Sequence, residues 1–393
     1  MAAPSSLPAP VDAVRLSRAK SRRAGRVAAR RILHQESNLK RVRACGRYPS
    51  SDELVGVKVS EVPGGLVAGY CGVALCGMTW VCPVCSARIA AKRQQEIADA
   101  ARKWQDTGGA VTMVTLTMRH ASVQRLADLW GALNGAWSNA TSGRAWQAER
   151  ERYGVAGWCR VVEATHGDNG WHVHVHAALF TDGASRWDPQ ELGSLMFSRW
   201  RDKLVSQGMR APLEGSGGLH VRTWAGRVEV LGEYFAKAVY EPDDRANAIG
   251  MEVARGDLKD GRISGHRTPF RILRDIAKNG DAADLALWHE WEKASHGRCQ
   301  LTWSKGFRAR LLADAPELTD EEIVEQDEGG VKVVSLPRGS WRTIERDPAL
   351  SAWVLELAEQ DLSGGVLRAG LDDKGIAWEW PKWVAALRRV EHR

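Results

Sequence analysis

The sequence has no apolar run long enough to cross a membrane. A transmembrane helix needs about 20 mainly apolar residues in succession, and no signal-peptide core follows the first residues either. We therefore expect a soluble, cytoplasmic protein without a membrane partner. Hydrophobic residues make up 44% of the 393 residues, which excludes a disordered chain and allows two or three compact units.

Cysteine is scarce: the chain contains seven, too few for a disulfide-stapled fold of this length. Four of them lie close together in the sequence: Cys71, Cys76, Cys82 and Cys85. Their spacing, C-x4-C-x5-C-x2-C, is typical of a structural zinc site with thiolate ligands. A redox or disulfide role is the alternative, and Cys45 could replace one of the four. We expect Cys159 and Cys299 to be small core residues.

Acidic residues are nearly absent from residues 1–44, which contain eleven Lys and Arg but two acids. Residues 314–328 have the opposite bias, with eight acids and no base. A basic segment in a chain of net charge +7 favours contact with nucleic acid. A solvated, disordered leader without such a role is the alternative, and the composition also allows an organelle transit peptide.

Three of the eleven histidines alternate within one apolar segment, residues 171–180 (Trp-His-Val-His-Val-His-Ala-Ala-Leu-Phe). The valines and the Ala-Ala-Leu-Phe end are typical of a buried strand. Because alternate residues of a strand share a face, His172, His174 and His176 project together. Buried imidazoles need partners, and a divalent metal is the usual one. Histidines on the solvated face of a half-exposed strand are the alternative.

Hydrophobic periodicity predicts both helices and strands, as in an α+β protein. The expected strands are 111–117, 160–164, 171–180, 219–224 and 300–303, and the expected helices are 87–105, 122–140, 189–207, 228–240 and 268–297. A turn at 165–170 makes the strands on either side of it a hairpin. In that hairpin we expect Glu163 to face His172, diagonal to His174, as a partner for the metal. An exposed strand carboxylate is the alternative.

Tyrosine is rare; the five are Tyr48, Tyr70, Tyr153, Tyr234 and Tyr240. Tyr234 and Lys237 lie one helical turn apart in the helix expected over 228–240. A phenol has a pKa of about 10, and it needs a nearby cation before it can act as a nucleophile. An ammonium group one turn away and a metal close by would supply that cation. A lone Y-x-x-K pair without any function is the alternative.

Three segments, in sequence order, resemble the motifs of HUH endonucleases: Met-Val-Thr-Leu-Thr (113–117), Gly-Trp-His-Val-His-Val-His (170–176) and Glu-Tyr-Phe-Ala-Lys (233–237). The arrangement is particularly similar to rolling-circle replication initiator (Rep) proteins of actinobacterial plasmids. Cys-Pro-Val-Cys (82–85) and Trp-Ser-Lys-Gly-Phe-Arg (303–308) also look like that group. The resemblance covers residues 71–310, so the two ends of the chain lie outside it.

The resemblance implies roles for the matching residues. It implies a bound Mg2+ or Mn2+, and the residues that match or could complete its ligand set are His172, His174, His176 and Glu163. It implies that Tyr234 is the nucleophile and that Lys237 accompanies it. The implied fold is the HUH nuclease core, an antiparallel sheet with the histidine strand near its centre and the tyrosine helix packed over it, preceded by the N-terminal zinc-binding module.

One departure concerns the end of the reaction cycle. Some plasmid initiators have a glutamate four residues before the tyrosine, proposed to activate the water that ends the cycle. That position is Val230 for Tyr234 and Ala236 for Tyr240. The groups that could replace this glutamate are Glu233, Glu229, Glu241 and Tyr240 itself.

The expected function is initiation of plasmid rolling-circle replication. The protein would nick a single-stranded or hairpin origin by tyrosine transesterification, leaving a 5′-phosphotyrosyl link and a 3′-OH primer for a host helicase and DNA polymerase. The expected organisation is a basic, disordered arm (1–44), a four-cysteine zinc module with a linking helix (45–107), the endonuclease core (108–310), and an acidic linker with a C-terminal tail (311–393). A transposase or relaxase with the same core, or a zinc-dependent DNA-binding regulator without enzyme activity, are the alternatives.

Overall fold

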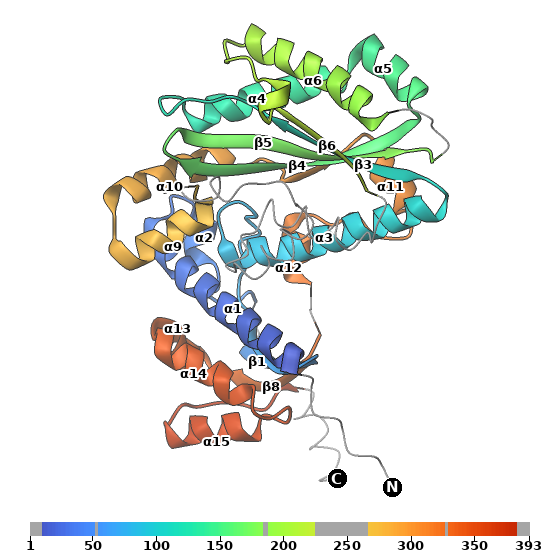
Figure 1. Cartoon of the computed structure of the whole chain (residues 1–393). Helices are drawn as coiled ribbons and strands as arrows, with labels where there is room; N and C mark the ends of the chain where they lie inside the picture. Colours follow the sequence, from blue (N-terminus) through green and yellow to red (C-terminus); the bar gives the residue numbers. More distant parts are fainter. Residues whose placement is uncertain (1–9, 52–53, 184–187, 225–265, 327–328, 383–393) are drawn as a thin grey trace. The chain divides into compact units, whose positions relative to one another are not determined.

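The computed structural model describes residues 10–51, 54–183, 188–224, 266–326 and 329–382. They form helices and two antiparallel sheets, drawn in Figure 1. The chain divides into two compact units, one made of residues 1–77 and 324–393 and the other of residues 78–323. Within the described ranges, every helix is too short or too polar to span a bilayer.

The unit of residues 78–323 is built on a five-stranded antiparallel sheet with the order β6-β3-β5-β4-β7. Its strands are β3 (Ala110–Thr117), β4 (Val155–Gly167), β5 (Gly170–Thr181), β6 (Leu219–Trp224) and β7 (Leu301–Trp303). The helices among the described residues from 83 to 325 are α3 (Pro83–Asp106), α4 (Leu126–Ala140), α5 (Gly143–Arg152), α6 (Pro189–Ser206), α9 (Pro269–Asn279), α10 (Ala282–Ser295), α11 (Phe307–Leu311) and α12 (Asp320–Glu325), with a 3-10 turn η1 (Glu214–Ser216). The histidine strand, β5, is therefore central.

Different helices cover the two faces of this sheet (Figure 1). On one face, Met113 and Phe180 pack with Ile97 of α3 and Phe307 of α11. The helices α4 and α6 lie over the other face and bury apolar side chains such as Trp130. Because β5 is covered on both sides, its residues 177–181 are all buried.

The expected helix over 268–297 is wrong as a single element, because two helices, α9 and α10, occupy that range. Gly280 ends α9 with a φ of 64°, in the left-handed region that continues no helix. Asp281 then begins α10, and its side chain accepts hydrogen bonds from two backbone N–H groups of the first turn. The expected helix over 228–240 lies outside the described residues.

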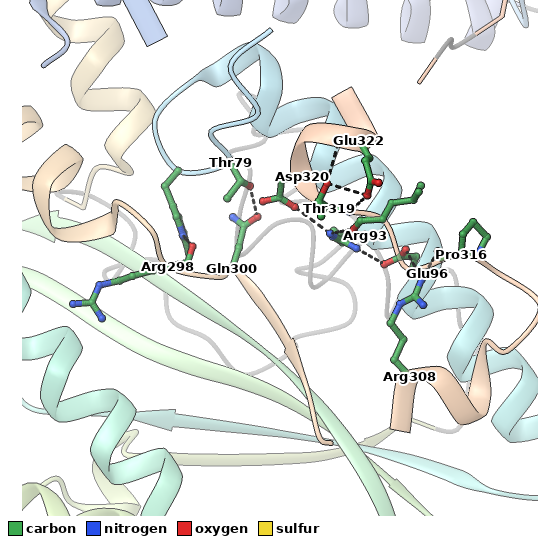
Figure 2. A network of polar contacts seen from close by, with 12 residues as sticks. Thr79, Arg93, Glu96, Arg298, Gln300, Arg308, Pro316, Thr319, Asp320 and Glu322 are labelled. Atoms are coloured by element: carbon green, nitrogen blue, oxygen red, sulfur yellow. Dashed lines mark hydrogen bonds and ion pairs between the residues drawn. The ribbon is translucent and has the colours of Figure 1, made fainter. Parts of the chain in front are cut away.

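Polar contacts hold the segment after α11 against α3 (Figure 2). The Arg308 guanidinium donates to Glu96 Oε1 at 3.0 Å and to the Pro316 carbonyl oxygen at 2.9 Å. Arg93 donates to Glu96 Oε2 at 3.0 Å and to Asp320 Oδ1 at 3.1 Å. The acidic segment that we expected to be a linker therefore begins with residues that pair with basic side chains.

The unit formed by both ends of the chain has a three-stranded antiparallel sheet with the order β2-β1-β8. Its elements are α1 (Pro10–Glu36), α2 (Lys40–Ala44), β1 (Val55–Val62), β2 (Gly65–Cys71), β8 (Val331–Leu336), α13 (Arg338–Arg346), α14 (Pro348–Ala358) and α15 (Gly365–Asp373). Val57, Val334 and Leu367 belong to one buried core. The expected C-terminal tail thus differs from the structure, in which β8 pairs with β1 and α13–α15 bury apolar residues.

The basic segment at the start also differs from the expected disordered arm, because its described part forms α1. Ala29 and Leu33, one helical turn apart, are 2% and 0% exposed. Lys20 and Arg23 form ion pairs with Glu359 at 2.8 and 2.7 Å. Composition indicates disorder here, but partners more than 300 residues away in the sequence stabilise the helix.

Candidate metal site

A short turn sets the register of the hairpin formed by β4 and β5. Gly167 pairs with Gly170, which leaves a turn of two residues. The predicted pairing of Glu163 with His172 is therefore wrong, since Glu163 lies opposite His174. The shift is an even number of residues, so Glu163 stays on the histidine face of the sheet.

Three side chains of this hairpin converge: Glu163, His174 and His176. Glu163 Oε2 lies 3.0 Å from His174 Nε2 and 2.9 Å from His176 Nε2, and the two nitrogens are 2.9 Å apart. The three contacts cannot all be hydrogen bonds, because a hydrogen on each nitrogen would set donor against donor, and a nitrogen without one cannot donate to the carboxylate. The side chains of His174 and His176 are only 13% and 7% exposed, so water does not provide the hydrogen bonds that the three groups cannot make with one another. Converging lone pairs of this kind could hold a metal ion.

The electrostatics of the group favour an ionised Glu163. Burial raises the pKa of this carboxyl, but His174 and His176, through charge and hydrogen bonding, outweigh burial and bring the pKa below its usual range. A carboxylate must be deprotonated to bind a metal, so the site holds Glu163 in the form that a ligand needs.

The remaining ring nitrogens of the two histidines differ. His176 Nδ1 lies 2.9 Å from the Thr115 hydroxyl of the neighbouring strand β3. His174 Nδ1 is buried and has no hydrogen-bond partner within the described part of the chain.

His172 lies on the same face but makes a separate contact. Its ring centroid is 5.1 Å from that of His174, and its Nδ1 is 3.0 Å from His120 Nε2. His120 Nδ1 in turn lies 2.9 Å from the Asn169 carbonyl oxygen, which can only accept. Burial lowers the pKa of His120, so its neutral ring donates through Nδ1 and accepts the hydrogen of His172 Nδ1. Burial, followed by the charges of His174, His120 and His266, lowers the pKa of His172 to about 3.

Four buried cysteines form a second group that could hold a metal: Cys45, Cys76, Cys82 and Cys85. Their sulfurs all lie within 4.8 Å of one another. Zn–S bonds of about 2.3 Å put the sulfurs of a tetrahedral site about 3.8 Å apart, so the four thiols fit zinc. Cys71, at the end of β2, lies outside the group, and Cys45 provides the fourth sulfur. Cys159 is buried as expected, whereas Cys299 is exposed and is not a core residue.

The predicted nucleophile and its neighbours lie outside the described residues: Glu229, Glu233, Tyr234, Lys237, Tyr240 and Glu241. The described residues on either side of this segment belong to the sheet that carries the histidines. Trp224 ends the edge strand β6, and Arg267 forms a bridge to His166 on β4. The His266 ring centroid is 6.0 Å from that of His172.

Sequence reasoning missed the contacts of Thr115 and His120. Thr115 lies in the segment 113–117, whose alternation of threonine with apolar residues could have indicated a polar contact on the histidine face. No local pattern indicates His120, because it follows the end of β3 and reaches His172 only through the folding of the sheet.

Comparison with known proteins concerns the family of the chain. A family model described as "Replication protein" matches residues 72–192, which include β3, β4 and β5. The chain is 28% identical over 359 residues to "Protein rep" of Streptomyces lividans, with 75% of this chain and 77% of that protein covered. It is 30% identical over 298 residues to "Neomycin resistance protein" of Streptomyces cyanogenus, with 64% of this chain and 67% of that protein covered. No solved structure matches the chain significantly. From the family match and these two relatives, the chain belongs to the Rep family of replication proteins.

Proposed function

We propose that this protein initiates rolling-circle replication of a plasmid by nicking one DNA strand at the origin. The observation that carries the proposal is the convergence of Glu163, His174 and His176 on the central strand of the sheet, in a member of the Rep family. The resemblance to HUH endonucleases provides the class of reaction, a transesterification in which a tyrosine replaces one side of a phosphodiester.

The group offers two imidazole nitrogens and one carboxylate oxygen, which are donors for a divalent cation. The resemblance to HUH endonucleases favours Mg2+ or Mn2+ at this group. Structural Zn2+ is the ion that we assign to the four cysteines.

When bound at this group, Mg2+ or Mn2+ would polarise the scissile phosphate and neutralise the charge that develops on it. Glu163, His174 and His176 would hold the cation at a fixed place on the sheet. The Tyr234 oxygen would form a bond to phosphorus as the bond to the 3′-oxygen breaks, and the phenol proton would end on the 3′-OH. The phosphodiester is exchanged rather than hydrolysed, so the reaction needs no ATP.

Lys237, three residues after Tyr234 in the sequence, would stabilise the phenolate or hold the phosphate. The contact between the rings of His266 and His172 supports the proposal that Tyr234 and Lys237 act at the histidine group, because His266 is the first described residue after them in the sequence. Glu233, Glu229, Glu241 or Tyr240 would act in the second step that ends the cycle.

The remaining parts would bind DNA rather than react with it. The basic residues of α1 and the cysteine group would bind duplex DNA and position the protein at the origin. Because such contacts to phosphates are electrostatic, we expect binding to weaken steeply as the salt concentration rises. A host helicase and a DNA polymerase would then extend the 3′-OH. The compartment that we propose for this reaction is the cytoplasm.

The test is cleavage of a supercoiled plasmid that carries the native replication origin. Wild-type protein with Mn2+ or Mg2+ should convert it to open circles and become attached to DNA. Tyr234→Phe should give neither nick nor adduct, because the variant keeps the ring but has no nucleophilic oxygen. Tyr240→Phe is the matched control and should still perform the first nick. Mass spectrometry of the attached peptide identifies the linked residue.

Nicking by Tyr234→Phe at the wild-type rate would exclude the proposed nucleophile. A requirement for zinc alone would contradict the assigned cation. A wild-type protein that binds the origin but never cleaves it would favour a DNA-binding regulator instead.

A further inference from the structure

Thr115 is the second residue, after Glu163, that reaches the histidine group from a neighbouring strand. It lies directly opposite His176 in the ladder between β3 and β5. Its hydroxyl oxygen is 2.9 Å from His176 Nδ1, while Nε2 of the same ring faces Glu163 and His174. The His176 side chain is 7% exposed, so this contact is shielded from water.

Whether His176 Nδ1 carries the ring hydrogen decides whether Nε2 can bind a cation. A neutral imidazole carries one hydrogen, and the nitrogen that binds a cation must be the one without it. When Nε2 is the ligand, Nδ1–H is a donor, and the Thr115 oxygen is there to accept. An outer partner of this kind fixes both the tautomer and the orientation of a metal-binding ring. Threonine is suited to the task because its branched side chain is stiff in a strand.

The same ladder contains an internal comparison. Thr117 lies opposite His174, as Thr115 lies opposite His176, and both threonines are on the histidine face. Yet His174 Nδ1 has no hydrogen-bond partner in the part of the chain that the structure describes. Two threonines with the same strand, face and type of neighbour therefore differ in one contact.

We propose that Thr115 is a positioning residue for the metal group, holding the Nε2 lone pair of His176 toward the cation. The proposal rests on the proposed function, because it takes Glu163, His174 and His176 as the ligands. It also assigns a role to the threonine-containing segment 113–117, which the HUH resemblance picks out without explaining.

Binding of Mn2+ to the full-length protein, followed by electron paramagnetic resonance, tests this role without DNA or cleavage. Thr115→Val keeps the shape of the side chain but removes the acceptor, and we expect Mn2+ affinity to fall about 10- to 100-fold. Thr117→Val is the matched control and should stay within about twofold of wild type, since the Thr117 hydroxyl makes no hydrogen bond to His174. Thr115→Ser restores an acceptor and should recover most of the affinity.

A second readout separates positioning from general damage. The visible absorption of Co2+ bound at the group reports ligand number and geometry, so Thr115→Val should change it and Thr117→Val should not. If Thr115→Val does not fold, as judged by circular dichroism, Thr115→Ala is measured in its place with the same expectation. Loss of affinity in both Thr115→Val and Thr115→Ser would contradict the hydroxyl's role.

The outcomes also separate this inference from the proposed function. Wild-type protein that binds no Mn2+ at the histidine group overturns the metal assignment in the proposed function. Wild-type protein that binds Mn2+, with Thr115→Val equal to Thr117→Val, overturns the role of Thr115 alone.

Discussion

Two ends of one sheet face in the unit of residues 78–323 have the same backbone pairing and opposite chemistry. At one end, Ala178 and Phe180 of β5 pack with Met113 of β3 against α3 and α11. At the other end, only two residues earlier on the same strand, His176 and His174 face Glu163. The ladder of hydrogen bonds continues through both ends, so the side chains alone make one end a core and the other a site.

The comparison shows how differently buried groups are satisfied. At the apolar end, aromatic rings only have to touch: Phe180 lies 4.9 Å from Phe307 and 6.4 Å from Trp104 between ring centroids. At the polar end, each imidazole nitrogen needs a partner of the right kind, and the described residues leave His174 Nδ1 without one. The apolar end therefore tolerates small changes in how its side chains pack, whereas the polar end depends on the positions of individual nitrogen and oxygen atoms.

The largest effect is expected from removing the charge at the polar end. Glu163→Gln retains the size of the side chain but replaces the carboxylate with a weaker ligand that carries no charge. Calorimetric titration with Mn2+ should then show no measurable binding at the histidine group, because two neutral imidazoles hold Mn2+ poorly. Glu61→Gln, an exposed position on β1, is the control and should bind as wild type does. Unchanged affinity in Glu163→Gln would remove this residue from the ligand set.

A change at the apolar end should affect stability without affecting the metal. Phe180 is 0% exposed, so Phe180→Ala leaves a cavity and should lower the free energy of unfolding by about 3–5 kcal/mol. Denaturant unfolding measures this loss, and Val123→Ala, at a side chain that is 88% exposed, should change little. Mn2+ affinity of folded Phe180→Ala should stay near the wild-type value. A large loss of affinity would show that the two ends are coupled.

The smallest effect is expected in the pH dependence of stability, through the protonation of His172. The folded protein holds the pKa of His172 at about 3, below the value of about 6.5 in an unfolded chain. Between these values the unfolded state binds up to about one more proton, so stability decreases as pH falls from about 6.5 toward 3. His172→Gln should flatten the decline of the unfolding midpoint over this range. Exposed His296→Gln is the control and should follow wild type.

The opposite result is equally informative. If His172→Gln leaves the pH dependence of the midpoint unchanged, the pKa of His172 is the same in the folded and the unfolded protein, and burial beside His120 does not lower it.

Much of the fold followed from local patterns. The strand over 111–117 and the helix over 189–207 are present as β3 and α6 with small shifts at their ends. The boundary within 268–297 was missed because Gly280 and Asp281 were read as helix, although a glycine followed by a capping residue is a common break. The helix α1 could not be predicted from its own residues, because Glu359, which forms ion pairs with Lys20 and Arg23, is distant in the sequence.

By itself, the sequence determined that His172, His174 and His176 share a face, because a strand alternates with a period of two whatever surrounds it. It also pointed to Glu163 as their partner, and to a cysteine group for which Cys45 was an optional member. Only the tertiary structure decided that Glu163 faces His174, that Thr115 reaches His176 and that Cys45 joins the other three sulfurs. The reason is physical: periodicity fixes the direction of a side chain, but its distance to another strand depends on turn length, register and long-range packing.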